Sequence, residues 1–283
     1  MGLAFKLYDP NKLLGDKEEY GITCALIPTN HEGIDNSNKH LPMNLAFMNG
    51  PIFGENVFIP IDWIIGGREQ AGKGWRMLVE CLSAGRGISL PALSSAMTHS
   101  SYRTVAAYSY LRKQFGLSIG KFEGIEEGLA RIAGFNYIVE ATRKLTTYSL
   151  DIGHHPSVIT AITKYHTTEL ARKCITDSMD IHAGKGIIQG ENNYLNNGYL
   201  GMPIAITVEG ANILTRNLMI FGQGSLRCHP YLLKEMDALG IENKEEAKEK
   251  FEEALKNDSN LLNEYESIKN PTFILCKSIV NNE

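Results

Sequence analysis

Cysteine is scarce in this sequence, and none of it is arranged for metal or redox chemistry. Five cysteines stand far apart in 283 residues, and no two of them form a C-x-x-C pair. An odd number of widely spaced thiols argues against a disulfide framework and is typical of a reducing compartment. We therefore expect a cytoplasmic protein whose core needs no covalent cross-links.

Long apolar runs are also absent. No stretch of 18 uninterrupted apolar residues is available to span a bilayer, and residues 1–7 lack the apolar centre of a secretion signal. The formal net charge of −4 gives no field strong enough to gather nucleic acid. We therefore expect no transmembrane segment and no nucleic-acid partner.

Metal-ligand patterns are missing as well. His154 and His155 are adjacent, whereas His166 and His182 stand alone. None of them has the H-E-x-x-H spacing, or a carboxylate at a helical offset, that would complete a zinc site. We predict no metal centre and interpret these side chains as solvated histidines.

What the sequence does contain begins with a β-rich region. Between residues 2 and 67, short runs of β-forming residues alternate with turn residues, and the clearest runs are 21–28, 45–48 and 56–60. We predict three to five strands. A sheet of this size needs closure or more pairings to be stable, so it resembles the second half of a larger β domain.

From Trp75 onward the apolar residues recur at helical spacing. This period predicts long helices that pack as a bundle, near residues 75–112, 124–150, 157–184 and 206–222. After Pro230 the chain becomes charged, and opposite charges four residues apart predict a surface helix over 242–250. The expected fold class is α+β, mainly α, with three parts: a partial β domain (1–68), an up-and-down four-helix bundle (69–227) and an additional helical C-terminal region (228–283).

One carboxylate stands at an unusual place in the chain. Glu209 follows the apolar run 203–208 and precedes Gly210, which predicts a loop just before a helix. An acid at a helix start is stabilised by the helix dipole by roughly 0.3 to 1 kcal/mol. Position alone therefore does not distinguish a catalytic base from a favourable charge.

A second pattern suggests a different enzyme. Residues 116–120 read Gly-Leu-Ser-Ile-Gly, which matches the nucleophile elbow of serine hydrolases with Ser118 as the nucleophile. Asp180 and His182 follow in the chain order that those enzymes use. The elbow requires a buried strand before the serine, whereas residues 102–114 are charged, rich in alanine and helical in period. The hydrolase is therefore kept only as an alternative.

Taken in order along the chain, these segments resemble the acyl-CoA dehydrogenase family, most closely its large bacterial members with an additional C-terminal domain. The resemblance runs from Gly2 to Leu233. Residues 21–28 and 56–60 are similar to the end of the family's β domain, and residues 72–75 to its entry into the helical domain. Four further segments are similar to its L-x-x-G-R, R-x-x-F-G-x-x-I, Q-x-x-G-G-x-G and Y-E-G-T-N elements, namely 82–86, 112–119, 180–186 and 208–212.

The resemblance implies α,β-dehydrogenation of fatty acyl-CoA to trans-2-enoyl-CoA with FAD as cofactor, as in fatty acid β-oxidation. It assigns Glu209 as the catalytic base and places Arg86 and Gly210 at the substrate. It also implies flavin contacts for Arg112, Gln114, Phe115, Gly184 and Ala211. The chain departs from the family's usual Gln, Gln and Thr at Asp180, Glu123 and Ala211.

The resemblance also implies partners. These are the acyl-CoA substrate, an electron-transferring flavoprotein or similar acceptor, and further copies of the chain, because the family builds its flavin site from neighbouring subunits. The family's N-terminal helical domain and the first half of its β domain have no counterpart in the sequence, so we expect a fragment. A non-catalytic remnant that serves only for folding or oligomerisation is therefore the main alternative.

Overall fold

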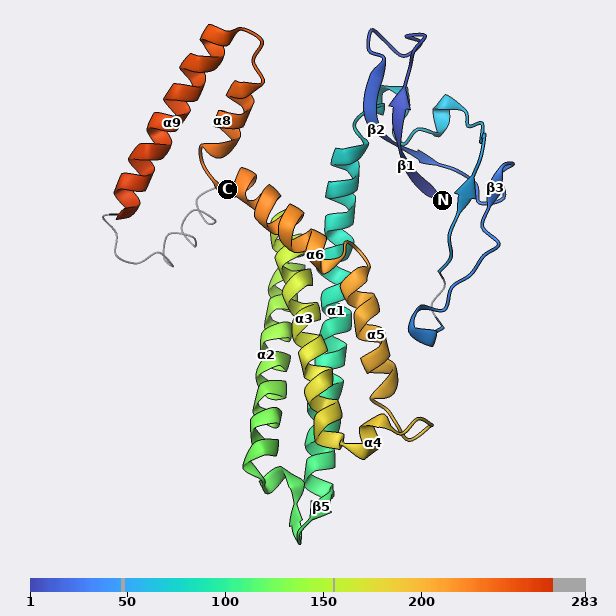
Figure 1. The fold of residues 1–283 in the computed structure, drawn as a ribbon, viewed down its shortest axis with the longest axis vertical. Helices are drawn as coiled ribbons and strands as arrows, with labels where there is room; N and C mark the ends of the chain where they lie inside the picture. Colours follow the sequence, from blue (N-terminus) through green and yellow to red (C-terminus); the bar gives the residue numbers. More distant parts are fainter. Residues whose placement is uncertain (47–48, 155, 267–283) are drawn as a thin grey trace. The chain divides into compact units, whose positions relative to one another are not determined.

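The computed structural model describes residues 1–46, 49–154 and 156–266. The chain divides by its contacts into two compact units, Met1–Ala211 and Asn212–Glu283. The described part is mainly helical with a small β region, which confirms the predicted α+β, mainly α, class (Figure 1).

The β region precedes the helices in the first unit. Its described strands are β1 (Gly2–Tyr8), β2 (Glu19–Leu26), β3 (Ile34–Asp35) and β4 (Phe53–Gly54). The pairs β1–β2 and β3–β4 are both antiparallel. In β2, the consecutive residues Thr23, Cys24 and Ala25 are all buried, and Ala25 also forms a bridge with Ile64. The centre of β2 is therefore the most enclosed part of this region.

The predicted strands had mixed outcomes. The run 21–28 is confirmed in part, because β2 ends at Leu26. A strand at 56–60 is wrong: Asn56 adopts a left-handed φ of 52°, Phe58 is exposed, and no described strand pairs with the segment. Leu45 and Ala46 lie in no strand, and residues 47–48 lie outside the described residues. Strand propensity needs a neighbouring strand to be realised, which a local run cannot supply.

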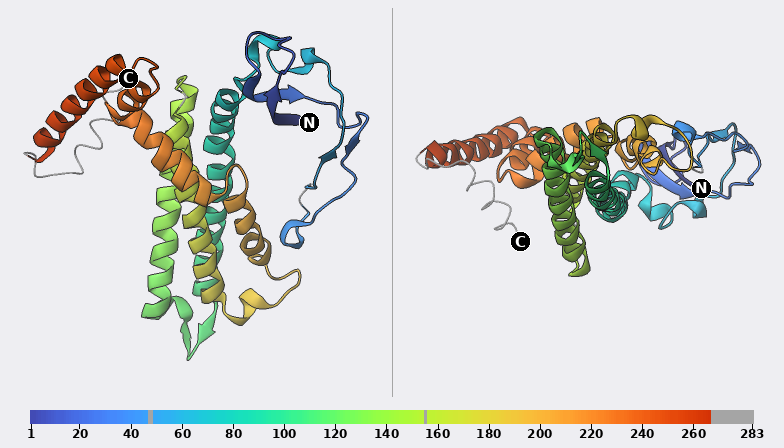
Figure 2. Two further views of the ribbon diagram at one scale, coloured as in Figure 1. Left: turned by 45° about the horizontal axis from the view of Figure 1, so that its top comes forward. Right: turned by 90° about the horizontal axis from the view of Figure 1, so that it is seen from below.

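Three long helices form the main body of the first unit. They are α1 (Gly74–Leu111), α2 (Glu123–Asp151) and α3 (Ser157–His182). All three lie side by side in both sets of views (Figures 1 and 2). The predictions for these helices are confirmed to within two residues at each end, since the helical period of apolar residues is a local signal.

The predicted fourth helix at 206–222 is wrong in its boundaries. The helix α5 (Asn196–Thr207) begins before the predicted range and ends two residues into it. Helical structure resumes in α6 (Asn212–Leu214). Between them, Glu209 and Gly210 have left-handed φ values of 54° and 90°. A right-handed helix cannot include such residues, so the loop 208–211 interrupts it.

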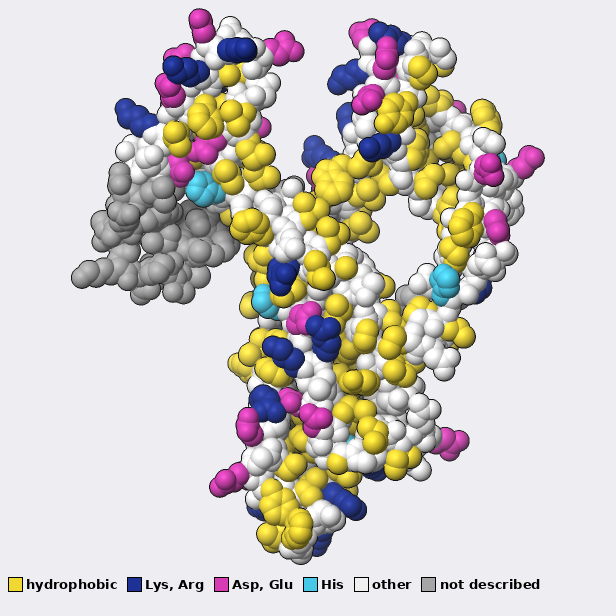
Figure 3. Space-filling view, viewed as in Figure 1, with side chains coloured by type: hydrophobic (Ala, Val, Ile, Leu, Met, Phe, Trp, Pro, Cys, Tyr) yellow, Lys and Arg dark blue, Asp and Glu magenta, His cyan; other side chains and the backbone are white. Residues whose placement is uncertain are grey.

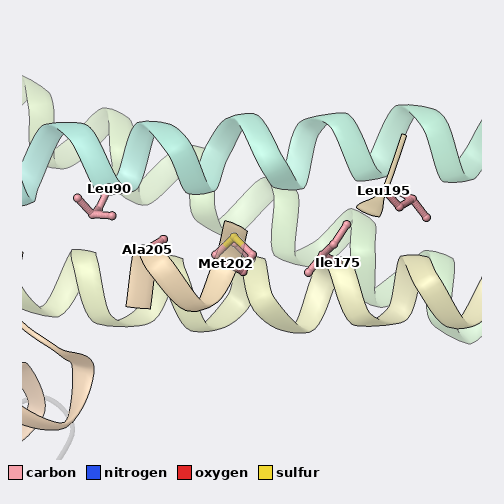
Figure 4. Packing of buried hydrophobic residues seen from close by; sticks show 6 residues of the cluster. Leu90, Ile175, Leu195, Met202 and Ala205 are labelled. Atoms are coloured by element: carbon pink, nitrogen blue, oxygen red, sulfur yellow. The ribbon is translucent and has the colours of Figure 1, made fainter. Parts of the chain in front are cut away.

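Two buried clusters hold the first unit together. The cluster between α1, α3 and α5 contains Leu90, Ala171, Ile175, Leu195, Met202 and Ala205 (Figure 4). The other cluster, toward the C-terminal ends of α1 and α3, contains Val105, Ile119, Ile132, Cys174 and Ile181. Because each large buried side chain contributes about 1.5 to 3 kcal/mol, the first cluster fixes α5, and with it the start of the 208–211 loop, against the two long helices.

The described part of the second unit consists of helices joined by short turns. After α6 come a π-helical segment (Thr215–Gln223), α7 (Gly224–Cys228), α8 (Leu232–Leu239) and α9 (Lys244–Glu266). The helices α8 and α9 pack against each other. The predicted surface helix over 242–250 is confirmed by α9, where Lys250 pairs with Glu246 and Lys248 with Glu252 at the expected spacing.

Charges of both signs are interspersed along the face of the helices that Figure 3 displays, as the small net charge suggests. In the described ranges, no helix is long and apolar enough to cross a membrane. The same ranges contain no group of three or more side chains placed to bind a metal ion.

An ion cluster between α1 and α2 gives a stability prediction. Glu140 accepts hydrogen bonds from Arg143 at 2.7 and 2.9 Å and from Ser95 at 2.5 Å. These contacts lower the pKa of Glu140 from 4.5 to about 2. A depressed folded pKa means that the carboxylate stabilises the fold fully above about pH 4.5 and that this contribution is lost as the pH falls toward about 2.

We therefore expect Glu140→Gln to lower the urea midpoint at neutral pH, and the difference from the natural sequence to shrink below pH 4.5. Urea titrations monitored by circular dichroism at several pH values would measure this. The exposed Glu32, which lies outside the helices, provides the control Glu32→Gln. A loss that is as large in acid as at neutral pH would contradict the prediction.

Candidate active site

The loop 208–211 presents a carboxylate in an unusual backbone conformation. The backbone N–H of Val208 donates to Ile204 and ends α5. Glu209 then takes a left-handed φ of 54°. This backbone conformation is sparsely populated by residues other than glycine and costs them about 1 to 3 kcal/mol. Gly210 follows at φ 90°, a conformation that favours glycine. Such a turn persists only where the surrounding groups hold it.

Arg86 on α1 is one of those groups. Its side chain is buried, and Nε donates to the backbone oxygen of Glu209 at 3.0 Å. Arg86 Nη1 and Glu209 Oε2 are also buried, and neither has a hydrogen-bond partner among the described residues. A Cβ built at Gly85 would lie 4.0 Å from Glu209 Oε2. Buried polar atoms without partners are rare in folded proteins, so these two mark a place where a polar ligand group would be accepted.

Lys164 on α3 reaches the same loop. Its side chain has no exposed surface, and Nζ donates to the backbone oxygens of Ile206 at 3.0 Å and Gly210 at 2.8 Å. Lys164 lies outside the sequence elements that resemble the family. A signal was present, because Lys164 lies three, four or seven positions from the small buried residues Thr160, Ala161, Thr167, Thr168 and Ala171. A lysine on the small-residue face of a helix is placed toward a packed neighbour.

The electrostatics of the loop follow from burial. Burial raises the pKa of Glu209, and the cations of Arg86 and Lys164 offset part of that rise. Burial lowers the pKa of Lys164 to about 8, and the charge of Arg86 acts in the same direction. A carboxylate with a raised pKa is a stronger base than a solvated one. The loop therefore holds a group suited to removing a proton from a weak acid.

The predicted flavin residues gather mostly in a different place. A groove of about 960 Å³ lies at the C-terminal ends of α1 and α3. Four of the five predicted residues line it, namely Arg112, Gln114, Phe115 and Gly184. Arg112 follows α1 directly. Gln114 and Phe115 belong to the hairpin that β5 (Lys113–Gln114) and β6 (Leu117–Ser118) form.

The lining of this groove suits a nucleotide cofactor. Arg112 and Lys185 supply cations for phosphate, and Phe115 presents an almost fully exposed ring for stacking. A Cβ built at Gly184 would meet no heavy atom within 4 Å, so a ligand can approach the backbone there. Asp180 and Glu191 also line the groove and add negative charge. The cations, the exposed ring and the open backbone of the groove therefore fit a nucleotide cofactor.

Ala211, the fifth predicted flavin residue, does not line this groove. It is exposed in the same loop as Glu209. Arg86 lies on α1 and Arg112 directly follows it, so the 26 positions from one to the other correspond to about 39 Å along the helix. The structure therefore brings Glu209, Arg86, Gly210 and Ala211 together and separates them from the other predicted flavin contacts.

His182 is buried, which corrects the interpretation that it is solvated. It lies at the end of α3 with 2% of its surface exposed. Its ring stacks on Tyr108, Nδ1 contacts the backbone oxygen of Ser178, and Nε2 contacts the hydroxyl of Tyr194 at 2.5 Å. Burial lowers the pKa of His182, so the neutral ring is favoured. An isolated histidine in a sequence does not reveal which helix will pack over it.

The same contacts argue against the serine hydrolase alternative. Ser118 lies in a short hairpin strand that follows the long helix α1, whereas a nucleophile elbow joins a buried strand to a helix. Its Oγ donates to the backbone oxygen of Tyr110 at 2.7 Å. Both ring nitrogens of His182 contact groups other than Ser118. These residues therefore do not form a catalytic triad.

Comparison with known families agrees with this architecture. A family model described as acyl-CoA dehydrogenase, C-terminal domain, matches residues 72–221, which is more than half of the chain. A second, described as acyl-CoA dehydrogenase, C-terminal, bacterial type, matches residues 226–261. The chain belongs to the acyl-CoA dehydrogenase family.

Curated relatives match parts of the chain. Protein HemX of Proteus mirabilis is 61% identical over 92 residues, which cover 32% of this chain and 54% of that protein. The probable acyl-CoA dehydrogenase FadE10 of Mycobacterium tuberculosis is 26% identical, over 61% of this chain and 26% of its own length. The short/branched chain specific acyl-CoA dehydrogenase of Bos taurus is 30% identical, over 55% and 36%. The chain thus spans about half or less of the length of these relatives.

Solved structures share the fold. Glutaryl-coenzyme A dehydrogenase in complex with glutaryl-CoA matches with a TM-score of 0.64 and 26% identity, over 80% of this chain and 55% of its own. Butyryl-CoA dehydrogenase of Megasphaera elsdenii matches with a TM-score of 0.65 and 23% identity, over 80% and 56%. The acyl-CoA dehydrogenase of Geobacillus kaustophilus matches with a TM-score of 0.66 and 19% identity, over 73% and 53%. These likenesses support the fold of the chain.

Proposed function

We propose that this protein dehydrogenates fatty acyl-CoA to trans-2-enoyl-CoA with FAD, as in fatty acid β-oxidation, and that Glu209 is the base. The observation that carries the proposal is the 208–211 loop, in which a carboxylate with a raised pKa is held by Arg86, whose buried Nη1 has no hydrogen-bond partner among the described residues. Membership of the acyl-CoA dehydrogenase family supports the reaction type. The fatty acyl substrate and its metabolic role are part of the proposal.

The chemistry asks two things of these residues. Glu209 takes the α proton, which an ordinary carboxylate with a pKa near 4.3 would do poorly. Burial raises that pKa. We propose that the backbone N–H of Glu209 donates to the thioester oxygen and so stabilises the negative charge that develops there. Gly210, which has no side chain, leaves room for the thioester. Bound FAD would supply the acceptor for the hydride that leaves the β carbon.

The proposal divides the flavin contacts between more than one copy of the chain. We assign Arg112, Gln114, Phe115 and Gly184 to the FAD of a neighbouring copy and Ala211 to the flavin near Glu209. The length of α1 between these two places, about 39 Å, supports this division. A homo-oligomer follows from it, and an electron-transferring flavoprotein or similar acceptor is proposed to reoxidise the flavin.

The division of the chain into three domains, with boundaries at 68/69 and 227/228, stays a prediction.

The proposal is tested with purified protein, FAD and a fatty acyl-CoA. We expect bound flavin whose visible absorbance falls when acyl-CoA is added, together with enoyl-CoA as product. Protein that stays colourless with added FAD would contradict the proposal for this chain and favour the folding or oligomerisation module. Labelling of Ser118 by a covalent serine probe, abolished in Ser118→Ala, would favour the hydrolase instead.

The groove gives a separate prediction. Arg112→Met is expected to weaken FAD binding about tenfold, because an arginine contributes charge-assisted hydrogen bonds to phosphate. Lys113→Met is the control, since the neighbouring lysine is exposed and does not line the groove. Titration of flavin fluorescence would measure both variants. Equal FAD affinities of the two variants would show that the groove does not bind FAD.

A further inference from the structure

We propose that Lys164 is a positioning residue for Glu209: its ammonium group fixes the loop that carries the base and supplies a cation close to it. The proposal rests on the function proposed above for Glu209. It concerns a residue of α3 that none of the recognised sequence elements includes.

The position of Lys164 is an unfavourable one for a charged side chain. The residue has no exposed surface and lies among small side chains of α3 that pack against α1. Burying an ammonium group is strongly unfavourable before its contacts are counted, and an apolar residue at this position would avoid that cost. The hydrogen bonds of the ammonium group therefore indicate a role of Lys164 other than packing.

Those contacts lie on both sides of Glu209. Lys164 Nζ binds the backbone oxygen of Ile206, in the last turn of α5, and that of Gly210, after the left-handed turn. One ammonium group thus joins the end of a helix to the residue that follows the base. A cation at a helix C-terminus also satisfies a carbonyl that has no helical partner and complements the helix dipole.

Arg86 completes the arrangement from a second helix. It binds the backbone oxygen of Glu209 itself. Three carbonyl groups within the span 206–210 are therefore held by two cations, one on α1 and one on α3. An uncommon backbone conformation persists where neighbouring groups over-determine it, which is the case at Glu209.

Lys164 also belongs to the charges around the base. Among the described residues, the charges that act on its ammonium include those of Arg86 from α1, Glu209 from the loop and Glu169 from its own helix. For Glu209, burial raises the pKa, and the charges of Arg86 and then Lys164 lower it. Removal of the ammonium group would therefore raise the pKa of Glu209 further, because the ionised carboxylate loses a nearby cation.

The substitution Lys164→Met tests the proposal, since methionine has a similar length without charge or donor. Lys173→Met, at an exposed position of the same helix, is the control. In the FAD-loaded protein we expect kcat to fall about tenfold with KM changed less than about threefold, because positioning acts on the chemical step. We also expect the acid limb of the kcat/KM profile to move to higher pH by about half a unit or more. A lysine with only a structural role would lower activity equally at all pH values.

Hydrogen exchange provides a readout that does not depend on turnover. We expect the backbone amides of residues 208–211 to exchange at least about tenfold faster in Lys164→Met than in Lys173→Met. If the natural sequence shows no dehydrogenation, the proposed function fails, whereas the exchange rates still decide whether Lys164 holds the loop. If Lys164→Met does not fold, Lys164→Gln is measured in the same way. An acid limb or an exchange rate that stays at the control value overturns the proposal.

Discussion

Glu209→Gln is expected to abolish dehydrogenation while leaving acyl-CoA binding nearly intact. The amide has almost the size of the carboxylate but cannot accept the α proton, and loss of a general base costs about 10²- to 10⁴-fold in rate. The loop should keep its shape, because Arg86 and Lys164 donate hydrogen bonds to backbone oxygens of the loop that the substitution leaves in place. The effect should therefore fall on kcat and not on binding.

Turnover and acyl-CoA affinity, measured separately on the same preparation, would check this. Glu126→Gln changes an exposed glutamate on α2 and should leave both unchanged. The natural enzyme should also lose activity as the pH falls through the pKa of Glu209, which burial raises, because the base acts in its ionised form. Retained turnover above about one percent in Glu209→Gln would exclude Glu209 as the base.

Arg86→Met is expected to have the second largest effect, about a hundredfold loss in kcat/KM. Hydrogen bonds to charged groups contribute about 1.5 to 3 kcal/mol, which corresponds to roughly ten- to hundredfold. The substitution removes the bond to the backbone oxygen of Glu209 and the buried Nη1 that has no partner among the described residues. It also removes the cation that most lowers the pKa of Glu209.

The matched control is Arg76→Met, at an exposed position of the same helix where the arginine pairs with Glu80. Steady-state kinetics over a range of pH would show the loss, together with an acid limb that moves to higher pH in Arg86→Met alone. Thermal unfolding of both variants separates loss of folded protein from loss of activity. Activity of Arg86→Met within about threefold of the control would show that the contact seen in the structure is not needed for the reaction.

The helices illustrate what local sequence patterns can predict. The boundaries of α1, α2 and α3 follow from the spacing of apolar residues and from breakers such as Gly153 and Pro156. The predicted helix at 206–222 was wrong at its start, because Glu209 and Gly210 interrupt it, whereas residues 212–222 are helical as predicted. Without Arg86 and Lys164, nothing along the chain indicates that a glutamate will adopt a left-handed conformation.

The candidate site shows the same division. The resemblance drew attention to Glu209, Arg86 and Gly210, and the structure brings these residues to one loop, whereas their roles stay predictions. The resemblance did not single out Lys164, which lies 46 positions from Gly210 along the chain. His182 was interpreted as solvated because a histidine alone carries no signal of burial.

The sequence by itself determined the mainly helical class of this protein, the course of its three long helices and its resemblance to a family, because these are properties of neighbouring residues and of ordered motifs. Only the tertiary structure decided that two cations hold the loop of Glu209. Arg86 is 123 positions from Glu209 along the chain, and their contact exists only because α1, α3 and α5 pack around one core. The burial and the pairing of charges depend on such contacts between distant residues. The base strength of Glu209 therefore depends on them too.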